Sequence, residues 1–216
     1  MATNAINPND FKIQIDSLYA YFERGKNLYG DKTLYRFNKT KGEEVSVSYR
    51  EMFDLITDLA LAFKKIGMEG KKVILLGETS VQWIASYLAT VTADGVIVPI
   101  DPLLLEEQIV EFTKFAKASY VVCSHKFAEI FKNHESELEG VEKIILTDRT
   151  QFTLDPEEEY VDEKLTTFNS VLSLGKCLAS NTDMTLDTRN HDVRKLGILL
   201  FTSGTTGSSK GVMLCE

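Results

Sequence analysis

Residues 72–100 read KVILLGETSVQWIASYLATVTADGVIVPI, and this stretch decides the fold class. The runs Lys72–Gly77 and Val96–Ile100 are short and continuously apolar, which is typical of strands buried on both faces of a sheet. The segment between them has helical spacing, opens on a capping-box pattern at Thr79–Gln82 and ends at Gly95. A strand, a helix and a second strand form a βαβ unit, whose right-handed crossover predicts parallel strands. The expected apolar face of the helix comprises Trp83, Ile84, Tyr87, Leu88 and Val91.

The same alternation continues toward the C-terminus. Helical spacing at residues 105–115 is followed by an apolar run at 120–123, a short helical patch near 127–131 and another apolar run at 141–146. A last apolar run covers Leu196–Phe201, which we expect to be a buried strand. The sequence therefore predicts an α/β fold in which a mostly parallel β-sheet is flanked by helices.

The N-terminal region precedes this alternation. Residues 11–29 have the spacing of an amphipathic helix, and residues 33–37 and 45–49 alternate polar and apolar side chains as a β-hairpin does. A capping box of the form S-x-x-E at Ser48–Glu51 opens a further helix, which Gly67 closes. We therefore expect a helix and a hairpin ahead of the sheet.

Residues 147–194 are polar and acidic, apart from one helical patch near 168–178. The run Asp155–Glu159 allows two interpretations: a site for a metal ion or a basic partner, and a solvated surface loop. Because a run of charges provides no ligand geometry by itself, we favour the surface loop.

The composition excludes several classes of protein. The 216 residues include 24 Lys and Arg against 32 Asp and Glu, a formal net charge of −8. Such a chain has no general electrostatic footprint for nucleic acid or for an anionic membrane surface. Residues 1–8 have neither the basic start nor the apolar run of a signal peptide, and no apolar stretch reaches the ~18 residues of a membrane span. We therefore expect a soluble, cytoplasmic protein.

The cysteines predict no covalent framework. Cys123, Cys177 and Cys215 lie far apart in the sequence, and no CxxC motif occurs. A disulfide framework and a structural zinc site are therefore not expected, and no residue of the chain is assigned as a metal ligand. Free cysteines most often behave as small buried hydrophobic residues, so we expect reduced, buried thiols.

Residues 202–211 read TSGTTGSSKG and directly follow the last predicted strand. Glycines allow positive φ and let successive N–H groups converge on one anion, while hydroxyls add neutral donors. Lys210 supplies a mobile ammonium as counter-charge for a polyphosphate. Because a strand that runs into such a loop commonly presents a phosphate site at the carboxyl edge of a parallel sheet, the sequence predicts a phosphate-binding loop here.

Other interpretations of this loop fit less well. A flexible linker rarely follows a core strand such as Leu196–Phe201. A Walker A loop requires G-x-x-x-x-G-K-[ST], whereas here Ser209 precedes Lys210 and Gly211 follows it. No G-x-G-x-x-G dinucleotide fingerprint follows any early strand. The predicted organisation is thus a helix and hairpin (1–50), a βαβ sheet region (51–147), a polar connecting segment (148–195) and a strand with its phosphate-binding loop (196–216).

The stretch Leu199–Val212, LLFTSGTTGSSKGV, resembles the AMP-binding signature of the adenylate-forming superfamily, which holds acyl-CoA synthetases, luciferases and the adenylation domains of peptide synthetases. The upstream order, from Ser48–Glu51 to Gly95–Pro102, is also similar, so the resemblance covers roughly residues 15–213. Two departures occur: Ser209 stands where the family often has Pro, and Lys71-Lys72 where it often has Gly-Asp. Neither touches the phosphate chemistry directly.

This resemblance implies an ATP-dependent carboxylate ligase. The carboxylate of a small-molecule acid attacks the α-phosphorus of ATP, pyrophosphate leaves, and the acyl-adenylate passes its acyl group to a thiol, commonly that of coenzyme A. Mg²⁺ would bridge phosphate oxygens, and residues 76–80 and 98–101 look most like those of bacterial fatty-acid ligases. By the same resemblance, the β- and γ-phosphates would be held by Thr202, Ser203, Gly204, Thr205, Thr206, Gly207 and Lys210.

Members of this family are more than twice as long as the chain, and their remaining adenine, ribose, magnesium and catalytic residues follow the signature. The resemblance therefore implies an incomplete N-terminal subdomain of an adenylate-forming enzyme, with no catalytic residue of its own and no activity alone. The alternative is a non-enzymatic nucleotide- or phosphate-binding module that a second chain completes.

Overall fold

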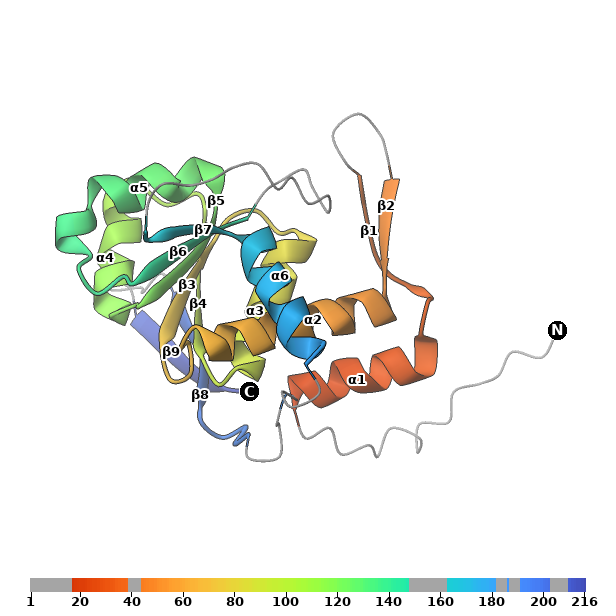
Figure 1. Cartoon of the computed structure of the whole chain (residues 1–216). Helices are drawn as coiled ribbons and strands as arrows, with labels where there is room; N and C mark the ends of the chain where they lie inside the picture. The colour runs from red at the N-terminus through yellow and green to blue at the C-terminus, as the bar shows by residue number, and fades with distance from the viewer. Residues whose placement is uncertain (1–16, 39–43, 148–162, 182–185, 187–190, 203–209) are drawn as a thin grey trace.

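A computed structural model describes residues 17–38, 44–147, 163–181, 186, 191–202 and 210–216 (Figure 1). Within them, one sheet is formed by β3 (Lys72–Leu76), β4 (Val96–Ile100), β5 (Tyr120–Ser124), β6 (Lys143–Thr147), β7 (Leu165–Thr167), β8 (Leu196–Thr202) and β9 (Lys210–Cys215). The spatial order of its strands is β7-β6-β5-β3-β4-β8-β9. Strands β3 to β8 pair in parallel, and β9 pairs antiparallel with β8 at one edge. The predicted α/β class with a mostly parallel sheet is confirmed.

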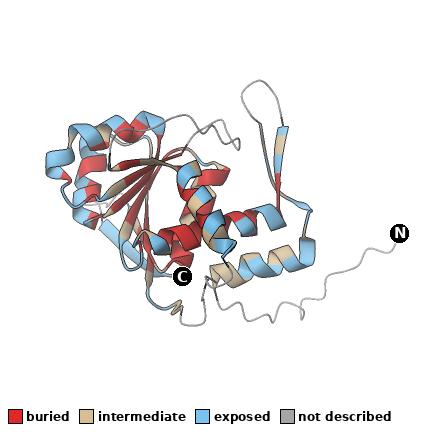
Figure 2. Cartoon of the chain, in the orientation of Figure 1, coloured by how far each residue is buried: buried red, intermediate tan, exposed pale blue. Residues whose placement is uncertain are grey.

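Helices cover both faces of this sheet, and the buried residues lie between the layers (Figures 1 and 2). Because successive side chains of a strand point to opposite faces, β3 contributes Val73 and Leu75 to one core and Ile74 and Leu76 to the other. The first core is closed by α2 (Tyr49–Lys65), α3 (Val81–Thr92) and α6 (Phe168–Ala179). The second is closed by α4 (Glu106–Ala116) and α5 (Ala128–Asn133), with 3-10 turns η2 (His125–Phe127) and η3 (Glu135–Glu137) beside them.

The N-terminal elements pack beside α2. They are α1 (Leu18–Tyr29) and the antiparallel hairpin of β1 (Thr33–Asn38) and β2 (Glu44–Ser48). The predicted capping box is present, because the Ser48 hydroxyl accepts from the Glu51 N–H at 3.1 Å and the Glu51 carboxylate accepts from the Ser48 N–H at 2.7 Å. Gly67 follows α2 with a φ of 89°, as predicted for the glycine that ends the helix. The expected start of the first helix at residues 11–16 and the hairpin tip lie outside the described residues.

The capping box predicted at Thr79–Gln82 is wrong by one residue. The helix α3 begins at Val81, and the hydroxyl of Ser80 accepts from the N–H of Trp83 at 3.1 Å. Thr79 fits the S/T-x-x-E/Q pattern through Gln82, whereas the residue three positions after Ser80 is Trp83. Either hydroxyl can act as an N-cap, and the helix starts after the one whose next residue, Val81, is buried in the first core.

Two strands escape the sequence prediction and one is more exposed than expected. The short strand β7 lies within the segment predicted as a polar connection, although the helix predicted near 168–178 is present as α6. The strand β9 is missed because its residues are exposed along its whole length. Strand β8 is not fully buried, since only Gly197 and Leu199 of its residues are classed as buried. The acidic run Asp155–Glu159 lies outside the described residues.

The expectation of buried thiols holds for one cysteine. Cys123 is buried in β5, whereas Cys177 and Cys215 are exposed. All three are free, so the absence of a disulfide framework agrees with the prediction for these residues. Among the helices that the structure describes, none combines the length and the apolar character required to cross a membrane.

Candidate phosphate-binding site

The predicted phosphate-binding residues begin at the carboxyl edge of the sheet. Because β3 to β8 run in parallel, their carboxyl ends lie along one edge, and ligands of open α/β sheets commonly bind outside that edge. Thr202 is the last residue of β8 and is exposed there. Lys210 is the first residue of β9 and is exposed as well.

Thr202 and Lys210 face each other across the β8–β9 hairpin. They are partners in the antiparallel register, and the Thr202 hydroxyl lies 3.5 Å from the carbonyl oxygen of Lys210, at the outer limit of a hydrogen bond. The structure thus brings the first and last of the predicted site residues together. The five between them, Ser203, Gly204, Thr205, Thr206 and Gly207, lie outside the described residues.

Aromatic packing holds the hairpin against α4. The ring of Phe201 stacks on Phe112 with centroids 4.3 Å apart and an angle of 6° between the rings. Phe115 of the same helix is 67% exposed and makes a T-shaped contact with Phe201, with ring centroids 5.7 Å apart. Gly211 fits beneath them, since a Cβ there would lie 3.2 Å from Leu199. The strands that flank the loop are therefore anchored immediately beside Thr202.

Other polar side chains at the same edge were not singled out from the sequence. Ser124 ends β5, and its buried hydroxyl has no hydrogen-bond partner among the described residues. Thr147 ends β6 and is buried, and Lys126 forms an ion pair with Glu78, which follows β3. Their only signal in the sequence is position, because each lies at or just after the end of an apolar run.

This edge has neutral hydroxyl donors and one exposed ammonium on the hairpin, which is a donor set for phosphate oxygens. Within the described ranges, no group of three or more His, Cys, Asp or Glu residues is placed to hold a metal ion.

Comparisons with known proteins match most of the chain, including the β8–β9 hairpin. The family model described as AMP-binding enzyme matches residues 22–215. Luciferin 4-monooxygenase of Photuris pensylvanica is 27% identical over 78% of this chain and 30% of its own length. Long-chain-fatty-acid–CoA ligase 5 of Rattus norvegicus is 26% identical over 92% of this chain and 29% of its own length. The chain thus spans about three-tenths of these curated relatives.

Solved structures share the fold at lower identity. The A-PCP didomain of carboxylic acid reductase from Segniliparus rugosus, solved in complex with AMP, superposes with a TM-score of 0.75 at 16% identity, over 95% of this chain and 32% of that one. A long-chain-fatty-acid-CoA ligase from Archaeoglobus fulgidus gives a TM-score of 0.70 at 19% identity, over 94% of this chain and 37% of that one. At these identities the likeness concerns the fold.

Proposed function

The chain belongs to the AMP-binding enzyme family, and we propose that it forms the part of an ATP-dependent, adenylate-forming carboxylate ligase that binds the phosphates of ATP. One observation carries this proposal beyond family membership. Thr202 and Lys210 flank the signature loop as register partners at the carboxyl edge of the sheet. A hydroxyl and an ammonium at the base of a glycine-rich loop are suited to hold a polyphosphate.

In the proposed reaction, a carboxylate oxygen attacks the α-phosphorus of ATP and the bond from the α-phosphorus to the α,β-bridging oxygen breaks, so that pyrophosphate leaves with that oxygen and an acyl-adenylate forms. The loop acts by positioning the phosphates and by stabilising the charge that develops on the departing pyrophosphate. Lys210 supplies the positive charge, and the glycines and hydroxyl residues supply neutral donors. The residues assigned to this role are Thr202, Ser203, Gly204, Thr205, Thr206, Gly207 and Lys210.

Magnesium is proposed to arrive with the nucleotide. The described residues provide no carboxylate cluster for the ion, whereas Mg²⁺ commonly keeps its waters and binds through phosphate oxygens. When bound, it would neutralise part of the triphosphate charge that Lys210 faces. We therefore propose that the chain binds the phosphates that carry the ion, and no residue of the chain is assigned as a ligand of the metal.

The acyl acceptor and the acid are finer proposals. We propose coenzyme A as acceptor and a fatty acid as the favoured acid, on the likeness of residues 76–80 and 98–101 to fatty-acid ligases. Two of the relatives named above are fatty-acid–CoA ligases, and another is a luciferin monooxygenase. A cytoplasmic location stays a prediction from the sequence.

Because the chain spans about three-tenths of its curated relatives, we expect the 216 residues alone to show little or no ligase activity. The same coverage favours a second candidate function, a nucleotide-binding module that acts with another polypeptide. The two differ in where the remaining residues of the site come from: a continuing reading frame in the first case, and a separate chain in the second.

The test is carboxylate-dependent exchange of labelled pyrophosphate into ATP. It is measured across a panel of acids, with the chain alone and with the longer polypeptide or the partner chain that completes it. We expect exchange in the completed protein and little or none in the chain alone. A well-folded completed protein that binds ATP and exchanges with no acid would contradict the ligase proposal.

A further inference from the structure

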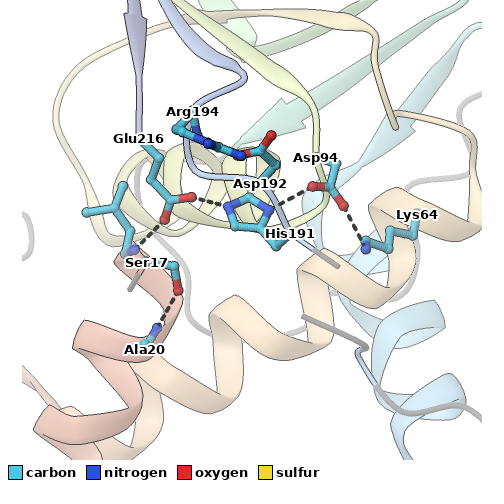
Figure 3. Close-up of polar contacts among 9 residues, drawn as sticks. Ser17, Ala20, Lys64, Asp94, His191, Asp192, Arg194 and Glu216 are labelled. Atoms are coloured by element: carbon cyan, nitrogen blue, oxygen red, sulfur yellow. Dashed lines mark hydrogen bonds and ion pairs between the residues drawn. The ribbon is translucent and has the colours of Figure 1, made fainter. Parts of the chain in front are cut away.

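His191 lies between two carboxylates at the base of the β8–β9 hairpin, at the opposite end from the loop (Figure 3). Its Nδ1 is 2.7 Å from Oδ1 of Asp94, and its Nε2 contacts Oε2 of Glu216. The side chains of His191 and Glu216 are 11% and 4% exposed. Water and salt therefore screen these contacts far less than they screen a surface ion pair.

The contacts join the hairpin to helices on one face of the sheet. His191 precedes β8, and Glu216 directly follows β9. Asp94 lies in the turn between α3 and β4 and accepts a hydrogen bond from Lys64 of α2 at 2.9 Å. Glu216 also accepts from the backbone N–H of Leu18 at the start of α1 (Figure 3). The imidazole ring of His191 thus connects the residues at both ends of the hairpin to Asp94, and through Asp94 to α2.

The geometry requires the protonated form of His191. A carboxylate is an acceptor only, and a neutral imidazole has a single N–H, so it can donate to one of the two carboxylates but not to both. Burial by itself would lower the pKa of His191, but the hydrogen bonds to Glu216 and Asp94 outweigh burial and raise the pKa. His191, Asp94 and Glu216 line one pocket at the base of the hairpin. The pocket has four other charged residues, two acidic and two basic: Glu69, Asp192, Lys72 and Lys195.

We propose that His191 is a positioning residue, which as an imidazolium fixes the base of the hairpin and thereby the placement of Thr202 and Lys210, the two described residues that flank the phosphate loop. The proposal rests on the function proposed above, since it concerns how this loop meets phosphates. An anchor matters because β9 is an edge strand, exposed along its length and paired with β8 on one side among the described strands. Loss of the proton leaves a neutral ring between the partly buried carboxylate of Asp94, which keeps Lys64, and the buried carboxylate of Glu216, so the contacts that hold the hairpin base are weakened.

The experiment compares the full chain with three variants by calorimetric titration of Mg-ATP between about pH 5.5 and 8.5, the range in which histidines titrate. His191→Gln removes the ring, and Glu216→Gln keeps an acceptor but removes one charge. His134→Gln is the matched control, because His134 also lies between two carboxylates, Glu137 at 2.9 Å and Glu106 at 3.0 Å, away from the hairpin base. Ionisation of ATP affects all four proteins equally and cancels in their ratios.

We expect the wild-type affinity to fall as pH rises through the pKa of His191. At pH 6, His191→Gln should bind Mg-ATP about 5-fold more weakly or worse, and its pH profile should lack this step. Glu216→Gln should move the step to lower pH, and His134→Gln should match the wild type. A His191→Gln profile parallel to that of the wild type would overturn the positioning role.

Amide hydrogen exchange gives a second readout that needs no nucleotide. At equal pH near 6, the amides of β8 and β9 should exchange about 5-fold faster or more in His191→Gln than in the wild type, with no change in β3 and β5. If the 216-residue wild type binds no ATP at any pH, amide hydrogen exchange alone decides the role of His191, and pyrophosphate exchange by the completed protein still decides the proposed function. Unchanged exchange in the hairpin of both His191→Gln and Glu216→Gln would contradict it.

Discussion

Gly175 of α6 lies directly against the backbone of Asp58 in α2. A Cβ placed on Gly175 would be 2.0 Å from the carbonyl oxygen of Asp58, which is far inside van der Waals contact. The two helices can therefore cross this closely only because residue 175 has no side chain. Their contact closes the first core over the sheet.

Gly175→Ala should destabilise the protein by about 1–3 kcal/mol, the usual cost of overpacking. The higher helix propensity of Ala, up to ~1 kcal/mol, opposes this effect but does not remove the overlap with backbone atoms. The free energy of unfolding in urea measures the change. Ser173→Ala, at an exposed position of the same helix, should be neutral or slightly stabilising. Equal stability of both variants would show that the helices separate at little cost.

Lys210→Ala should weaken ATP binding by the chain and slow adenylation by the completed ligase by on the order of 10–1,000-fold. The reason is loss of the ammonium of Lys210 at the loop end of the hairpin, so Lys210→Arg should restore part of the effect. Pyrophosphate exchange and calorimetric titration of ATP measure the two quantities. Lys132→Ala, an exposed lysine on α5, is the matched control and should behave as the wild type. A Lys210→Ala protein with unchanged ATP affinity would remove Lys210 from the site.

Cys123 should resist thiol reagents in the folded protein. Burial raises the pKa of its thiol to about 12, so the reactive thiolate is scarce at pH 8, and the side chain is also inaccessible. Cys177 and Cys215 are exposed and should react quickly. A colorimetric count should therefore give two thiols in the native state and three after unfolding. Cys123→Ser should lower only the second count, and a third fast thiol in the native protein would contradict the buried position.

Asp94→Asn should destabilise the protein near pH 7 by about 1.5–3 kcal/mol, the usual range for hydrogen bonds to a charged group. Asn tolerates the left-handed backbone at this position, where φ is 61°, so the substitution removes charge without adding strain. Burial by itself would raise the pKa of Asp94, but the hydrogen bonds from Lys64 and His191 outweigh it and lower the pKa below 3.8.

A carboxyl group with a lowered pKa stabilises the fold above its unfolded pKa, and this stabilisation is lost as pH falls through the folded pKa. The difference between wild type and Asp94→Asn should therefore be full near pH 7 and shrink below about pH 4. Urea unfolding at both pH values checks this. Asp31→Asn, which breaks an exposed ion pair with Arg50, is the control and should change stability little at either pH. A difference that persists unchanged in acid would mean that the Asp94 charge is not what matters.

Local patterns were enough to predict most elements of the sheet region. Continuous apolar runs such as Lys72–Leu76 indicated strands buried on both faces, and β3 has this burial. The glycine-rich run after Phe201 indicated a phosphate loop, and the observed strand ends place Thr202 and Lys210 on either side of it. By contrast, β9 is exposed on both faces and β7 has three residues, so neither leaves a periodic signal.

The sequence by itself determined the fold class, the family resemblance and the position of the loop, because each depends on burial periodicity or on neighbouring residues. Tertiary structure alone decided the strand order, the pairing of β8 with β9 and the surroundings of His191. Its partners Asp94 and Glu216 are 97 and 25 residues away along the chain. Single histidines and carboxylates carry no local pattern, so only the packing of distant segments brings these three side chains together.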